Sequence, residues 1–192
     1  MPNILAVDTT TASCSAALLV NHELITQSQL SERNHTKLIL PMIDELLREG
    51  GLTPSQINVI AFTAGPGSFT GIRIGFGIVQ GLAFGLDIPV VSVSSLETLA
   101  HTAIRKIKIQ TDTLITPMLD ARMNEVYWAQ FSYHSGSLMR INNDCLSGPE
   151  TLSKELSYPS IIVGDGLNYI EKLPKESTDP SHLSLLPEAQ DI

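Results

Sequence analysis

The 192-residue chain is poor in cysteine and in basic residues. Its two cysteines cannot build a disulfide framework, and they form no CxxC motif. Only 12 Lys and Arg residues stand against 20 Asp and Glu, which gives a net charge of −8. Because phosphate binding draws on Lys and Arg, a chain this acidic is a poor candidate for holding nucleic acid by itself. The composition therefore disfavours a disulfide-stabilised scaffold and an autonomous nucleic-acid-binding module.

The sequence also lacks the pattern of a secretory leader and of a membrane span. The N-terminus enters a strand-like pattern directly, without the charged and apolar regions of a signal peptide. The apolar stretch 71–85 contains two polar residues, Arg73 and Gln80, and is soon followed by a proline, whereas a membrane helix needs ~20 apolar residues. Hydrophobic residues make up 43% of the chain, which predicts a packed core. We expect a cytoplasmic protein that does not associate with membranes.

Residues 57–93 predict a strand, a glycine-rich turn, a helix and a second strand. Ile57–Phe62 is apolar and rich in β-branched residues, and Gly65-Pro66-Gly67-Ser68 interrupts it. Residues 70–86 are long enough for a helix, and we expect Val90 and Val91 to begin another buried run. The pattern indicates a βαβ unit, whose two strands should lie parallel.

The predicted helix 70–86 is apolar on nearly every face, which is typical of a helix buried on nearly every face. It contains glycines at 71, 75, 77, 81 and 85. Each glycine costs a helix about 1 kcal/mol relative to alanine, and a four-residue spacing stacks glycines into a groove. We interpret one face as covering the chain's own sheet and the other as the docking surface for a protein partner. The alternative is a wholly intramolecular buried helix.

Ahead of this unit the sequence predicts strands at 3–7, 14–20 and 24–28. The first of these strands ends at Asp8, and Thr9, Thr10 and Thr11 follow it. A hydroxyl-rich loop beside an acid suits a phosphate with its magnesium ion. A simple turn in which Asp8 accepts backbone hydrogen bonds is the alternative interpretation.

A helix predicted over 36–48 places a wide apolar stripe on one side. The stripe consists of Leu38, Ile39, Met42, Ile43, Leu46 and Leu47. Leu40 extends the apolar surface beyond the stripe. We therefore expect this helix, too, to face more than its own core.

A change in composition around 107–112 marks a predicted boundary between a domain at 1–108 and a domain at 109–192. The second half predicts further strands and one short helix, with no long element after residue 173. The predicted strands are 114–119, 125–133, 137–141 and 161–163, and the helix is 149–156. The two halves together predict an α/β protein with two mixed sheets flanked by helices.

The run GPGSFTGIRIG, from Gly65 to Gly75, resembles the bacterial TsaB (YeaZ) family, subunits of the machinery that makes threonylcarbamoyl-adenosine in tRNA. Further matching pieces occur in order between residues 4 and 166: Ala6-Val7-Asp8-Thr9-Thr10, Arg33-Asn34-His35, Leu40-Pro41, Asp120-Ala121-Arg122, Glu125-Val126-Tyr127 and Gly164-Asp165-Gly166. The resemblance implies an actin-like or sugar-kinase-like ATPase fold, with two RNase H-like domains on mixed five-stranded sheets. The second domain is expected to be reduced, because no further helix and Pro-x-Tyr-like tail follow Pro187.

The resemblance also implies a partner. Family members pair through their first two helices with the TsaD-type catalytic subunit, or with themselves as homodimers. A TsaE-type ATPase would join through the complex, and tRNA would be contacted indirectly. The implied role is a non-catalytic scaffold or activator in the modification of tRNA next to the anticodon. The expected partner-binding residues are Leu38, Ile39, Met42, Ile43, Leu46, Arg73, Gly77, Gln80, Gly81 and Phe84.

Catalytic residues, a metal site and a required cofactor are not expected in this chain alone. The TsaD-type relatives carry an HxxxH metal pair where this chain has Ser95 and Leu99, and leucine has no lone pair to donate. Asp8, Thr9 and Thr10 would form a vestigial phosphate loop, with ATP or ADP expected only at the partner interface. The alternatives left open are an autonomous ATPase or phosphotransferase that uses Asp8 and a metallopeptidase.

Overall fold

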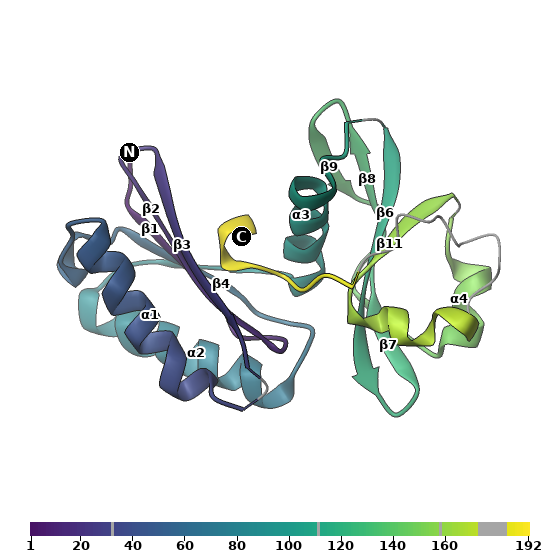
Figure 1. The fold of residues 1–192 in the computed structure, drawn as a ribbon, viewed down its shortest axis with the longest axis horizontal. Helices are drawn as coiled ribbons and strands as arrows, with labels where there is room; N and C mark the ends of the chain where they lie inside the picture. Colours follow the sequence, from purple (N-terminus) through teal and green to yellow (C-terminus); the bar gives the residue numbers. More distant parts are fainter. Residues whose placement is uncertain (32, 111, 158, 173–183) are drawn as a thin grey trace. The chain divides into compact units, whose positions relative to one another are not determined.

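The computed structural model describes residues 1–31, 33–110, 112–157, 159–172 and 184–192 (Figure 1). These residues form two compact units, Met1–Thr98 with Pro187–Ile192, and Leu99–Leu186. The division falls at 98/99 rather than at the predicted 108/109, inside helix α3 (Ser95–Ile107). The last residues of the chain return to the first unit instead of completing the second.

The first unit is built on a five-stranded mixed sheet in the order β3-β2-β1-β4-β5. Its strands are β1 Ile4–Asp8, β2 Ser13–Val20, β3 Glu23–Leu30, β4 Val59–Thr63 and β5 Val90–Val93. The first three pair antiparallel as a meander, and β4 and β5 add in parallel on the other side of β1. Asn21 and His22 join β2 to β3 with φ values of 49° and 69°, as a two-residue hairpin turn requires. The predicted meander and parallel βαβ unit are confirmed.

Helices α1 (His35–Glu49) and α2 (Phe69–Leu86) cover the same face of this sheet (Figure 1). The short 3₁₀ turn η1 (Pro54–Gln56) leads from α1 into β4. Leu5 and Leu18 of the sheet pack against Ile39 and Leu46 of α1 and Val79 of α2 in one core. Alternate residues of each strand point toward this core, as the pleat of a β-sheet dictates.

The opposite face of the sheet carries small side chains. Ala6, Ala17 and Ala61 are register partners on three adjacent strands, and Ala189 packs on them. Ala189 belongs to the 3₁₀ turn η4 (Ala189–Asp191), and its backbone N–H donates to Ser15 Oγ at 2.9 Å. The C-terminal residues are therefore part of the first unit's packing.

The described part of the second unit contains six strands, whereas five were expected. They are β6 Thr113–Arg122, β7 Glu125–Trp128, β8 Phe131–His134, β9 Ser137–Arg140, β10 Cys145–Ser147 and β11 Ser160–Val163. The sheet order is β10-β7-β6-β8-β9, and β11 pairs with β6 in parallel. Residues 99–107 of α3, helix α4 (Pro149–Glu155) and the 3₁₀ segment η2 (Asp165–Lys172) complete the described part of this unit.

The prediction of one long strand over 125–133 is wrong, because this segment forms two strands, β7 and β8. Both pair antiparallel with β6 in one common register, which places Ala129 opposite Pro117. The backbone N–H of Ala129 reaches the Pro117 carbonyl at 3.4 Å, but proline has no N–H to return a bond. The ladder is interrupted at that pair.

Candidate functional site

The loop after β1 is closed on itself. Asp8 is fully buried, and its Oδ1 accepts from the Thr10 backbone N–H at 3.0 Å and from Thr10 Oγ1 at 2.7 Å. The same oxygen accepts from Thr63 Oγ1 on β4. Asp8 Oδ2 has no hydrogen-bond partner among the described residues. The geometry is that of the alternative interpretation, a turn whose aspartate accepts local hydrogen bonds.

The start of α2 packs against Thr9 and Thr10 of this loop. The Thr10 carbonyl accepts from the Ser68 backbone N–H at 2.7 Å, and Thr9 Oγ1 donates to the Gly71 carbonyl at 2.8 Å. A Cβ on Gly67 would lie 2.3 Å from the Thr10 oxygen, and a Cβ on Gly71 would lie 2.0 Å from the Thr9 oxygen. The glycines thus permit a backbone contact that leaves Thr9 and Thr10 buried, with their polar groups used by the chain itself.

Burial raises the pKa of Asp8 above its ordinary value, and this cost outweighs the hydrogen bonds from Thr63 and Thr10 and the field of His35. Burial, with the nearby Asp8 carboxylate, also raises the pKa of the Cys14 thiol to about 11. Both pKa values are raised because the two side chains lie where little solvent can stabilise their charged forms.

Asp8→Asn is expected to stabilise the first unit near neutral pH. Because the pKa of Asp8 is higher in the folded chain than in the unfolded one, wild-type stability falls as pH rises from the unfolded value of 3.8 through the folded pKa. Asparagine keeps the Oδ1 acceptor and removes the charge. We expect a gain of about 1–2 kcal/mol at pH 7 that vanishes in acid. Urea unfolding of both proteins from pH 4 to 8 measures it, and parallel pH profiles would contradict it.

Helix α1 directs most of its predicted partner-binding residues inward. Ile39, Met42, Ile43 and Leu46 are between 0 and 7% exposed and belong to the first unit's core, while Leu38 is half-buried against it. The apolar stripe covers the sheet, so these four side chains do not form an accessible surface. Leu40 is the apolar residue of α1 that remains substantially exposed.

Helix α2 behaves differently. The side of α2 that faces the sheet is buried, and consists of Gly71, Gly75, Val79 and Ala83. The five residues of α2 that were predicted to bind a partner are all exposed: Arg73, Gly77, Gln80, Gly81 and Phe84. Phe84 is 90% exposed. The alternative of a wholly buried helix is therefore wrong for this chain.

The helix is long and apolar enough to meet the length and composition of a membrane span, and is the one such helix in the described ranges. Here, however, α2 connects two parallel strands of a sheet and packs on it.

The glycines of α2 fall into two sets. A Cβ on Gly71 or Gly75 would collide with Thr9, so these glycines serve the loop contact described above. A Cβ on Gly77, Gly81 or Gly85 would meet no atom within 4 Å. The chain's own packing therefore explains the inner glycines but gives no reason for the outer ones.

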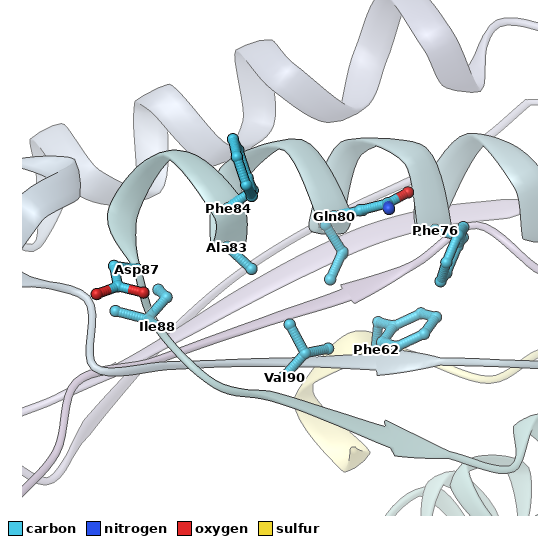
Figure 2. A pocket seen from close by; sticks show the side chains of 9 residues that line it. Phe62, Phe76, Gln80, Ala83, Phe84, Asp87, Ile88 and Val90 are labelled. Atoms are coloured by element: carbon cyan, nitrogen blue, oxygen red, sulfur yellow. The ribbon is translucent and has the colours of Figure 1, made fainter.

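A pocket of about 360 Å³ opens between α2 and strands β4 and β5 (Figure 2). It is lined by Phe62, Phe76, Val79, Gln80, Ala83, Phe84, Asp87, Ile88 and Val90. The centroid of the Phe76 ring lies 6.1 Å from that of Phe62. The expectation that Val90 and Val91 are buried is wrong, because β5 is an edge strand and both side chains are substantially exposed. The sequence analysis did not identify Phe76 and Val90 in this lining, nor Phe69, which is exposed at the start of α2. Phe69 and Phe76 are seven residues apart, and this spacing could have indicated from the sequence that both lie on one side of the helix.

Ser95 and Leu99, the two positions compared with the HxxxH pair, are both fully buried. Ser95 Oγ donates to Thr10 Oγ1 at 3.1 Å, and the Leu99 side chain is aliphatic. In the portions of the chain that the structure covers, no three His, Cys, Asp or Glu side chains gather closely enough to hold a metal ion. The absence of a metal site stays a prediction.

Comparisons with known proteins agree on one family. The model for TsaD, tRNA N6-adenosine threonylcarbamoyltransferase, matches residues 19–185. The chain is 49% identical over 127 residues to the tRNA threonylcarbamoyladenosine biosynthesis protein TsaB of Haemophilus influenzae, covering 66% of this chain and 52% of that protein. It is 39% identical over 178 residues to the protein of the same name from Escherichia coli, covering 91% of this chain and 76% of that protein.

Solved structures lead to the same group. YeaZ from Pseudomonas aeruginosa superposes on this chain with a TM-score of 0.88 at 37% identity, covering 100% of this chain and 88% of that one. A second structure from Pseudomonas aeruginosa, described as similar to peptidase YeaZ, superposes with a TM-score of 0.90 and the same identity and coverage.

Proposed function

Because this chain belongs to the TsaB (YeaZ) family, we propose that it is a non-catalytic subunit that binds and activates a TsaD-type subunit in the threonylcarbamoyl-adenosine modification of tRNA. The observation that supports this most is the exposed side of α2. Phe69, Phe76 and Phe84 are 68%, 51% and 90% exposed on one helix. Fully burying one such side chain is worth about 1.5–3 kcal/mol, so a partner that covered this surface would gain substantial free energy.

The closed Asp8 loop supports a role without catalysis. Thr9 and Thr10 are engaged with Gly71 and Ser68, so a phosphate at this loop would have to displace the start of α2. Ser95 and Leu99 offer no metal ligand pair, which argues against a metallopeptidase. We assign ATP or ADP to the partner interface, and the link with a TsaE-type ATPase to the complex as a whole.

The charge of the chain fits an indirect role toward tRNA. With a net charge of −8 it is suited to docking on another protein rather than to neutralising phosphates. The proposal places it in the cytoplasm, where the TsaD-type subunit would supply the contacts to tRNA.

The proposal is tested with Phe84→Glu, which puts a charge on the exposed side of α2. We expect its dissociation constant for the TsaD-type subunit to rise at least ~30-fold, because one buried phenylalanine is lost and a carboxylate is desolvated. Titration calorimetry measures binding, and formation of modified tRNA should fall in parallel. Met139→Glu, at an exposed apolar position on β9, is the matched control and should bind like wild type.

Two results would overturn this proposal. One is wild-type protein that does not bind the TsaD-type subunit while modification proceeds equally well without it. The other is magnesium-dependent nucleotide hydrolysis by the isolated chain that Asp8→Ala abolishes, which would favour the autonomous ATPase instead.

A further inference from the structure

The pocket between α2 and the edge of the first unit's sheet has an apolar floor and a partly polar rim. Its floor contains Phe62, Val79 and Ala83, which are at most 8% exposed. Its rim includes Gln80 and Asp87, both exposed. The volume of about 360 Å³ and a mostly apolar lining with a few polar groups are those of a small-molecule site.

The two ends of this pocket differ in polarity. At one end Phe76 points from α2 toward Phe62 on β4, and at the other end Asp87 follows the last residue of α2 (Figure 2). The last carbonyl groups of a helix carry partial negative charge, so Asp87 adds a full negative charge to an end that is already negative. A ligand that matches both ends carries a positive charge near Asp87 and an apolar body toward the aromatic rings.

The chain does not neutralise this negative end itself. Asp87 is the only ionisable group in the lining, and among the residues that the structure describes it forms no ion pair. Arg73, the charged residue within α2, lies roughly 21 Å away along the helix axis and stacks on Phe69. Because no positive group of the lining would attract an anion, the pocket favours cations over anions.

A planar guanidinium group, or the related amidinium group, suits this pocket better than an ammonium group. It pairs with a carboxylate through two parallel N–H···O bonds, and it is less strongly hydrated, so leaving water costs it less. We propose that the pocket binds a small amidinium or guanidinium compound whose cation pairs with Asp87 and whose flat apolar body lies between Ala83 and Val90. This site goes beyond the proposed function, because its ligand is a small molecule rather than a protein subunit.

Three probes of nearly the same size and shape test the charge of the ligand: benzamidinium, benzamide and benzoate. Each is titrated into the isotope-labelled full chain, and NMR follows the backbone signals of Val79, Ala83 and Val90. Benzamidinium should shift these signals with a dissociation constant of about 1 mM or lower, an ordinary affinity for so small a ligand. Benzamide should bind about 3- to 5-fold more weakly, the scale of a partly exposed charge pair. Benzoate should not bind detectably.

Asp87→Asn tests which residue selects the cation. Asparagine tolerates the left-handed conformation of this position, where φ is 54°, so the exposed substitution should leave the fold unchanged. The affinity for benzamidinium should fall to that for benzamide, while the affinity for benzamide stays within about 2-fold of wild type. Asp44→Asn, at an exposed position of α1, makes the same change in net charge and is the matched control. It should bind all three probes like wild type.

Any of three results would overturn this inference. Benzamidinium might shift no signal of the pocket, benzamide might bind as tightly as benzamidinium, or Asp44→Asn might weaken benzamidinium binding as much as Asp87→Asn. The second result would describe an apolar site without charge selection, and the third an effect of overall charge. All measurements use this chain alone, so their failure leaves the proposed function untouched. Failure of the TsaD-type subunit to bind would likewise leave the ligand site untouched.

Discussion

Gly71→Ala is expected to lower the free energy of unfolding by about 3 kcal/mol. The added Cβ would lie 2.0 Å from the Thr9 carbonyl oxygen, and both groups are held by backbone structure rather than by a flexible side chain. Relief requires α2 to move away from the loop, which breaks the hydrogen bond from Thr9 Oγ1 to the Gly71 carbonyl. Urea unfolding followed by circular dichroism measures the loss.

Gly81→Ala is the matched substitution on the same helix. Its Cβ would meet no atom within 4 Å, and alanine favours a helix by about 1 kcal/mol over glycine. We expect Gly81→Ala to be neutral or stabilising by up to that amount. Equal destabilisation by the two substitutions would show that the contact between α2 and the Asp8 loop is not what requires glycine at position 71.

Leu46→Asp should prevent folding of the first unit or cost more than about 4 kcal/mol. Leu46 is fully buried in the core between α1 and the sheet, where a carboxylate finds no charged partner. Leu40→Asp on the exposed side of α1 is the control, and we expect it to cost less than about 1 kcal/mol. Thermal unfolding compares the two variants with wild type.

Normal folding of Leu46→Asp would contradict the assignment of the α1 stripe to the core. If the variant folds like wild type and loses only partner binding, then the stripe of α1 is an interface, as its sequence pattern indicated. Burial of the stripe in the isolated unit would then be an arrangement that the partner opens.

The first unit could be predicted well because its signals are local. The alternating strands, the glycine-rich turn after β4 and the long helix that follows each lie within a few residues of one another. Its hairpin, parallel pair and mixed sheet follow from those signals. The second unit depends on register, which single segments do not reveal. Pro117 interrupts the ladder opposite Ala129 only because of how β6 pairs, and β10 has three residues, too few to show alternation.

The candidate site, too, could be predicted only where the signals in the sequence are local. Periodicity identified an apolar stripe on α1 but could not say what covers it, and the answer is the chain's own sheet. On α2 the apolar residues surround the helix, so the pattern did not separate the buried Val79 from the exposed Phe76. The Asp8 loop had two interpretations, and Gly67 and Gly71, about sixty residues away, decide its geometry by a contact that no local pattern contains.

The position of Ala189 on the first unit's alanine surface bears on how the protein is synthesised. The ribosome makes Ala6, Ala17 and Ala61 early, but the residue that covers them leaves it only after the whole of Leu99–Leu186 has been translated. During that interval one face of the nascent sheet lacks its cover, and Ser15 Oγ lacks the N–H that bonds to it in the finished chain. The unit that is translated first therefore cannot complete its packing until Ala189 has been made.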